Sequence, residues 1–138
     1  MRNIIFILTS IIFISCQEDF PIYDKFCTKK ETLNCLSYDM LIKDSDKKRL
    51  QDAFGFENNQ SCQYRVQLLK YHIGDCNNPI VKSVGSDFNG YVRVTISNGL
   101  DCYYKVQSDF KDDEDGAFDR VLNKIRQEFG IHFLKPIK

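Results

Sequence analysis

The chain has 138 residues, which is enough for one small domain, and its 43% hydrophobic and 28% charged residues are typical of a globular protein. Its 19 basic residues are balanced by 19 acidic ones, so nothing in the composition draws the chain toward nucleic acid. We therefore expect a single folded domain and no nucleic-acid partner.

The first residues have the layout of a secretory leader. Arg2 precedes an apolar run over 4–14, which is too short for a transmembrane helix because such a helix needs about 20 residues. The run ends in Phe13-Ile14-Ser15-Cys16, where a small residue stands directly before a cysteine. This motif resembles the lipobox of bacterial lipoproteins, with Phe13 at the position where that motif usually has leucine.

The resemblance implies that residues 1–15 form a signal peptide and that Cys16 becomes the lipid-bearing first residue of the mature chain. Each buried CH₂ of an acyl chain contributes about 0.8 kcal/mol, so several chains anchor a protein permanently. Because no aspartate follows Cys16, the resemblance favours the bacterial outer membrane, with the domain periplasmic or surface-exposed. The alternative is an ordinary signal peptide cut after Ser15, which leaves Cys16 free to form a disulfide.

Beyond the leader, the sequence predicts a tether and then helices. Residues 16–30 show no periodicity and are expected to be a lipid-anchored tether, which leaves 31–138 as a single domain. A first helix is expected over 32–41, and a second over 46–54, where Gly55 can end it.

Strand patterns dominate the middle of the chain. Residues 62–73 fit either a strand or a helix, and their β-branched and aromatic side chains favour a strand. A short strand is expected over 80–84. The clearest pattern is a hairpin over 91–106, in which apolar residues alternate on both arms. A three-residue loop over 97–99 would place the apolar side chains of both arms on one face.

The last strong pattern is an amphipathic helix. Acidic residues over 112–115 suit a helix N-terminus, where the helix dipole favours negative charge. Gly130 can end the helix before a short edge strand over 131–134. The apolar stripe recurs at helical spacing through Phe118, Val121, Leu122, Ile125 and Phe129. The expected fold is α+β, with an antiparallel sheet of three to four strands and the N-terminal and C-terminal helices packed on one face.

Six cysteines make disulfides possible if the chain is exported. If Cys16 carries a lipid, at least one of the other five thiols stays unpaired. Cys102 faces the core in the expected hairpin and is the candidate for a buried free thiol. Four other cysteines are candidates for disulfides: Cys27, Cys35, Cys62 and Cys76. Cys27 is close enough in sequence to Cys35, and Cys62 to Cys76, for either pair to close a local loop, but the connectivity cannot be read from the sequence.

Motifs for catalysis or metal binding are not found. The cysteines lack the close spacing of zinc sites, and the acidic run before Gly116 fails the calcium-loop pattern because Lys111 and Leu122 fall at ligand positions. The two histidines, His72 and His132, belong to no recognisable catalytic pattern. We therefore expect no metal site, no cofactor and no enzymatic activity.

The expected function is that of a non-catalytic lipoprotein of the bacterial cell envelope. The membrane would be one partner, through the lipid, and a protein would be the other, as for an assembly accessory or an immunity or inhibitor protein. Tyr71, Tyr91 and Tyr103 could form an aromatic face for it, or be ordinary solvated sheet residues. One alternative is a carrier of a small hydrophobic ligand, which needs an apolar pocket. Another is a hydrolase, which needs a cleft that holds His72 beside carboxylates of strongly shifted pKa.

Overall fold

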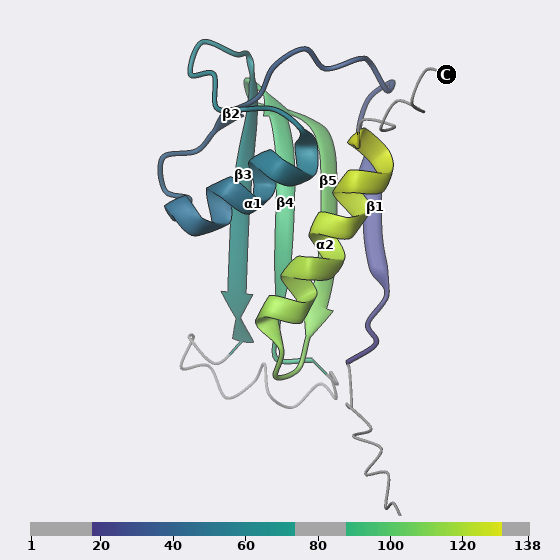
Figure 1. Ribbon diagram of the computed structural model, residues 1–138. Helices are drawn as coiled ribbons and strands as arrows, with labels where there is room; N and C mark the ends of the chain where they lie inside the picture. The colour runs from purple at the N-terminus through teal and green to yellow at the C-terminus, as the bar shows by residue number, and fades with distance from the viewer. Residues whose placement is uncertain (1–17, 74–87, 131–138) are drawn as a thin grey trace, which may run out of the picture.

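The computed structural model describes residues 18–73 and 88–130. The strands expected over 80–84 and 131–134, together with Cys16, Cys76 and His132, lie outside these residues. A five-stranded sheet and two helices form the described fold, and the strands lie in the order β1-β5-β4-β3-β2 (Figure 1). Their bounds are Ile22–Phe26 for β1, Ser37–Tyr38 for β2, Tyr64–His72 for β3, Gly90–Asn98 for β4, Asp101–Phe110 for β5, Asp44–Phe54 for α1 and Glu114–Phe129 for α2.

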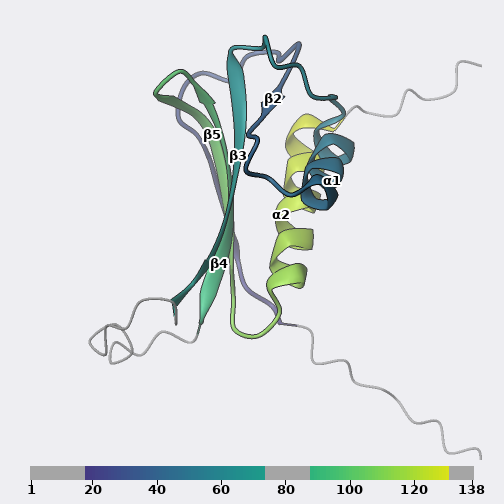
Figure 2. The same ribbon diagram turned by 90° about the vertical axis from the view of Figure 1, so that its left-hand side faces the viewer.

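Both helices cover the same face of the sheet, as Figure 2 shows with the sheet seen edge-on. The α+β class and the C-terminal helix on one face are thus confirmed. The prediction of three to four antiparallel strands was too small and too regular. The observed sheet has five strands, and β2 runs parallel to β3. Residues 62–73, which fitted either a strand or a helix, contain β3. Within the described residues, neither helix is long and apolar enough to cross a membrane.

The core lies between the helices and the covered face of the sheet. The expected stripe of α2 is buried at Phe118, Val121, Leu122 and Ile125, and Phe129 packs against its edge. Leu50 and Phe54 of α1 and Val66, Val92, Val94, Ile96, Tyr104 and Val106 of the sheet are buried with them. Each buried side chain of this size contributes about 1.5–3 kcal/mol. Helix α1 begins two residues earlier than expected and ends at Gly55, whose φ of 76° is left-handed.

The hairpin of β4 and β5 differs from the expected one in its turn. Strand β4 ends at Asn98 and β5 begins at Asp101, so the loop between them has two residues. Gly99 in this loop adopts a φ of +63°. The predicted three-residue loop was wrong, because a β-bulge in β5 brings the apolar side chains of both strands to one face instead. Ile96 pairs with Tyr104 and Ser97 with Cys102, which leaves Tyr103 as one extra residue on β5. This extra residue shifts the register by one and returns the apolar side chains of both strands to the covered face.

Two N-terminal expectations were also wrong. Residues 22–26 are not part of a tether but form β1, which pairs with β5 at the sheet edge. The folded unit therefore begins earlier than residue 31. The helix expected over 32–41 is absent, because Ser37 and Tyr38 form β2 and Leu33 and Leu36 are buried from an irregular segment.

Candidate functional site

The face of the sheet that the helices leave uncovered is the candidate site (Figure 2). Alternation along each strand assigns its side chains, because the other parity is buried against the helices. We call this surface the open face, and its members are Tyr23 and Lys25 of β1, Lys105, Gln107 and Asp109 of β5, Tyr91, Arg93 and Thr95 of β4, and Arg65, Gln67, Leu69 and Tyr71 of β3.

A hollow of about 220 Å³ lies on the open face where β1, β5 and β4 are neighbours. Its lining includes three cationic residues and one acidic residue, with one apolar and two polar ones beside them: Lys25, Lys105, Arg93, Asp24, Val106, Tyr23 and Gln107. We call it the cationic hollow. Because three adjacent strands each supply one cation, it is suited to a negatively charged group.

Arg93 is held in place at the centre of the open face. Its Nε and Nη2 donate hydrogen bonds to Gln107 Oε1 at 2.9 and 2.7 Å, and Gln107 Nε2 donates to Asp109 Oδ1 at 2.9 Å. The guanidinium lies 4.7 Å from the ring centre of Tyr91, which stacks on Tyr71 with 5.2 Å between the ring centres. A side chain fixed in this way loses little conformational entropy when a ligand binds.

The distribution of ion pairs separates the two faces of the sheet. Within residues 18–73 and 88–130, every ion pair includes a residue of α1 or α2. The open face has four cations, and none of them takes part in these pairs: Lys25, Arg65, Arg93 and Lys105. Its only acidic residue is Asp109. Although the whole chain is neutral, this face is therefore positive.

Lys25 and Lys105 also stand directly opposite each other in the β1–β5 register. Like charges that face each other across two strands are destabilising. The free protein therefore carries a repulsion at this point, which an anion in the cationic hollow would relieve.

An apolar rim continues the open face beyond Arg93. A second hollow of about 370 Å³ is lined by Arg93, Gln67, Leu69 and Leu41, among others. Leu41 is 92% exposed and Leu69 is 46% exposed, and the neighbouring Met40 is 87% exposed. Exposed apolar side chains beside arginine and tyrosine are typical of protein–protein interfaces.

On the covered side, His72 belongs to a charged cluster. It contacts Glu114, while Lys70 Nζ lies 3.0 Å from Asp46 Oδ2 and 3.5 Å from Glu114 Oε1. Lys70 also lies over the ring of Phe118 at 4.7 Å. These contacts join β3 to the starts of both helices, so the arrangement fits a structural role better than a catalytic one. Among the described residues, no group of three metal-ligating side chains is found.

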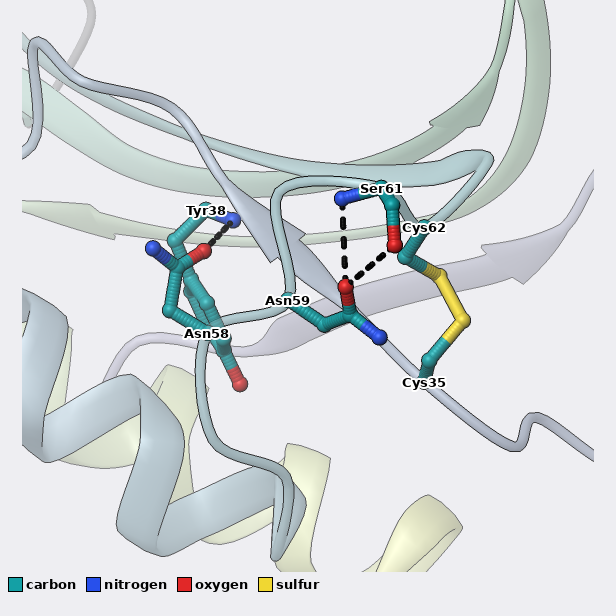
Figure 3. Close-up of a disulfide and its surroundings, with 6 residues drawn as sticks. All are labelled: Cys35, Tyr38, Asn58, Asn59, Ser61 and Cys62. Carbon is teal, nitrogen blue, oxygen red and sulfur yellow. Dashed lines mark hydrogen bonds between the residues drawn. A yellow bond between two sulfur atoms is a disulfide. The ribbon is translucent and has the colours of Figure 1, made fainter.

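Four cysteines form two disulfides, Cys27–Cys102 and Cys35–Cys62. The expectation that Cys27, Cys35 and Cys62 form disulfides is confirmed, although neither pair closes the short loop that the spacing allowed. The buried free thiol expected at Cys102 is wrong, because the bulge at Tyr103 takes this residue out of the core register. Figure 3 shows the Cys35–Cys62 bridge beside the turn in which Asn59 Oδ1 accepts hydrogen bonds from Ser61.

The start of the described chain is clamped to the fold at Glu18. Its carboxylate accepts hydrogen bonds from the backbone N–H groups of Asp112, Lys111 and Asp113 at 2.7, 3.2 and 3.3 Å. Burial by itself would raise the pKa of Glu18, but these three hydrogen bonds and the charge of Arg120 lower it. The clamp therefore holds an ionised carboxylate only two residues after Cys16.

No family model, no curated protein and no solved structure matches this chain. What the fold and the site define is a disulfide-bonded α+β domain with an uncovered, positive sheet face. Sequence reasoning named Tyr71 and Tyr91 on this face but not its lysines and arginines. Tyr103, the third tyrosine of that set, is buried at the bulge.

Proposed function

We propose that this protein is a non-catalytic binding module of the bacterial cell envelope, held at the outer membrane by a lipid on Cys16. Its open face would engage a protein partner. The observation that carries the proposal is the open face itself, where a fixed arginine, stacked tyrosines and unpaired cations lie beside exposed leucines. Tyrosine and arginine are the residues in which protein interfaces are enriched.

The two disulfides support the exported location. Disulfides persist in oxidising compartments such as the bacterial periplasm and the cell surface, and they are rare in the cytosol. Both bridges join segments far apart in the chain, with separations of 75 and 27 residues, so they staple the domain as a whole.

The Glu18 clamp supports a close and oriented attachment rather than a long tether. Two extended residues span at most about 7 Å, so a lipid on Cys16 would hold the membrane next to the turn between β5 and α2. That turn lies at one end of the molecule, whereas the open face is on its side (Figures 1 and 2). A partner could therefore reach the open face while the domain stays anchored.

The alternative functions receive less support from the described residues. A carrier needs an apolar cavity, but the cationic hollow is lined by charged residues, and the aromatic side chains of Phe26, Phe54 and Phe129 pack on one another around the core. A hydrolase needs an activated nucleophile, but among the described residues His72 hydrogen-bonds to Glu114 and to no serine, threonine or cysteine.

Intact mass spectrometry of the protein extracted from bacterial membranes tests the anchor. We expect a chain that begins at Cys16 and carries acyl mass, and the Cys16→Ser variant should lose that mass. Reduction should add four protons, which correspond to the two disulfides. A lipid-free chain that begins at Cys16 and gains six protons would contradict the anchor and indicate a soluble secreted protein.

Site-specific photocrosslinking in living cells tests the open face. A photoreactive residue in place of Gln67 on the open face should form a discrete adduct with a protein, whereas the same residue in place of Gln127 on α2 should not. Both are exposed glutamines, so they form a matched pair. Adducts from Gln127 alone would move the interface to the helices and refute the proposed face.

A further inference from the structure

We infer that the cationic hollow binds a carboxylate-rich segment of the partner, with Lys25, Lys105 and Arg93 as its contacts. The inference rests on the proposed function for its choice of a protein as the occupant. It adds the chemical nature of the contact, an acidic peptide segment, and its position between β1, β5 and β4.

The first argument is the repulsion between the two lysines. Lys25 and Lys105 are cross-strand partners, and within the described residues neither has an ion pair or a side-chain hydrogen bond. A carboxylate seated between them would satisfy both ammonium groups at once. The free energy that the free protein loses to repulsion would then be regained on binding.

The second argument is that the carboxylates of the fold nearest to this position have partners other than the two lysines. Asp24 also lines the hollow, but its carboxylate is engaged on the covered side, where Oδ1 lies 3.7 Å from Lys124 Nζ and Oδ2 accepts a hydrogen bond from Tyr104 Oη. Asp109 on the open face accepts a hydrogen bond from Gln107. The cations of the hollow are therefore available to an external acid.

The third argument is the geometry of Arg93. A guanidinium has five N–H donors, and the hydrogen bonds to Gln107 use only those on Nε and Nη2. The Nη1 group has no hydrogen bond within the described residues. Arginine is suited to carboxylates because its donors match the two oxygens in one plane.

The composition of the open face favours a protein over a nucleic acid. Nucleic-acid binding depends on many phosphate contacts, and a protein without net positive charge lacks the long-range attraction for them. Leu41 and Leu69 of the apolar rim line the second hollow together with Arg93, and a phosphate backbone would leave them exposed. A segment with both acidic and apolar side chains would cover the cationic hollow and this rim together.

Fluorescence anisotropy with a labelled six-glutamate peptide tests the inference on the membrane-extracted protein in detergent. The peptide should bind, and a six-glutamine peptide should not. The variant Lys25→Gln/Lys105→Gln should weaken binding about five- to tenfold, as expected for two exposed ion pairs. The variant Lys43→Gln/Lys48→Gln removes the same charge from exposed lysines at α1 and should bind as the wild type does.

A second variant separates binding from stability. Lys105→Glu replaces the like-charge pair by a lysine–glutamate pair, so we expect a higher urea midpoint together with loss of peptide binding. A lysine pair that only served the fold would not give opposite effects on the two measurements. Unchanged peptide binding by Lys105→Glu would overturn the inference.

Three further outcomes would also overturn it. One is equal weakening by both double variants, which would indicate a general charge effect. The second is equal binding of the glutamine peptide. The third is tighter binding of a labelled six-nucleotide single-stranded DNA or of inorganic phosphate than of the acidic peptide. The peptide assay does not depend on the lipid, so it can fail independently of the proposed function. If the acidic peptide does not bind but Gln67 forms an adduct, the inference is wrong and the proposed function stands. If the peptide binds but the protein carries no lipid, the inference stands and the proposed anchor is wrong.

Discussion

Removing the Cys27–Cys102 disulfide should destabilise the domain more than removing Cys35–Cys62. In the chain-entropy model, the stabilisation grows with the logarithm of the loop that a bridge closes. The sequence separation of 75 residues corresponds to about 4.5 kcal/mol and the separation of 27 to about 3.5 kcal/mol. Since each variant keeps the other bridge, the two variants should differ in stability by about 1 kcal/mol, whatever the nesting of the loops.

Serine replacement suits this comparison because none of the four cysteines is fully buried, so the variants leave no large cavity. We would measure urea unfolding of Cys27→Ser/Cys102→Ser and Cys35→Ser/Cys62→Ser by far-ultraviolet circular dichroism. Both would carry Cys76→Ser so that no thiol can exchange with the remaining bridge. Against a total stability of about 5–15 kcal/mol, either loss is large enough to measure.

Two results would refute the reasoning. A loss below about 1 kcal/mol for Cys27→Ser/Cys102→Ser would show that the bridge does not constrain the unfolded chain as the model requires. A clearly larger loss for the smaller loop would show that local packing near Cys35, and not loop length, sets the stabilisation.

Three further predictions concern single contacts. Glu18→Gln should cost about 1 kcal/mol at neutral pH. Because the pKa of Glu18 is lowered by folding, this difference from wild type should shrink as the pH falls below the ordinary value of 4.5 in urea titrations. Tyr103→Phe removes a buried hydroxyl that donates to Glu31 O at 2.7 Å and accepts from Glu31 N at 3.0 Å, so thermal unfolding should report a loss of about 1–2 kcal/mol. Leu50→Ala empties a fully buried site of α1 and should cost about 2–5 kcal/mol in the same assay.

The parts of the fold that the sequence predicted are those fixed by local patterns. Helix α2 combines an acidic start with an apolar stripe at helical spacing, and both signals lie within one segment. Strands β4 and β5 alternate strongly enough to be recognised, and Gly99 marked their turn. The bulge at Tyr103 could not be predicted, because a two-residue loop with a bulge and a three-residue loop both place Val94, Ile96, Tyr104 and Val106 on the covered face.

The parts that the sequence missed depend on distant partners. In β1, only Ile22 and Phe26 are apolar enough to signal a buried side, and the strand exists because β5 offers an edge about eighty residues later. The cationic hollow was hidden for the same reason. Lys25 and Lys105 become neighbours only through the β1–β5 register, and a chain of zero net charge gives no sign of a positive face.

Strand β1 connects the two proposed functions of the molecule, attachment and binding. An edge strand of five residues would be expected to fray, since it is hydrogen-bonded on one side only. Here the chain is held on both sides of the strand, by the Glu18 clamp before it and by the Cys27–Cys102 bridge after it. Between these points lie Tyr23 and Lys25, which form one wall of the cationic hollow. The clamp and the bridge therefore stabilise the segment that would both follow the lipid and contact the partner. With the proposed lipid on Cys16, they would fix the distance between the membrane and the proposed binding site, which a flexible tether would leave variable.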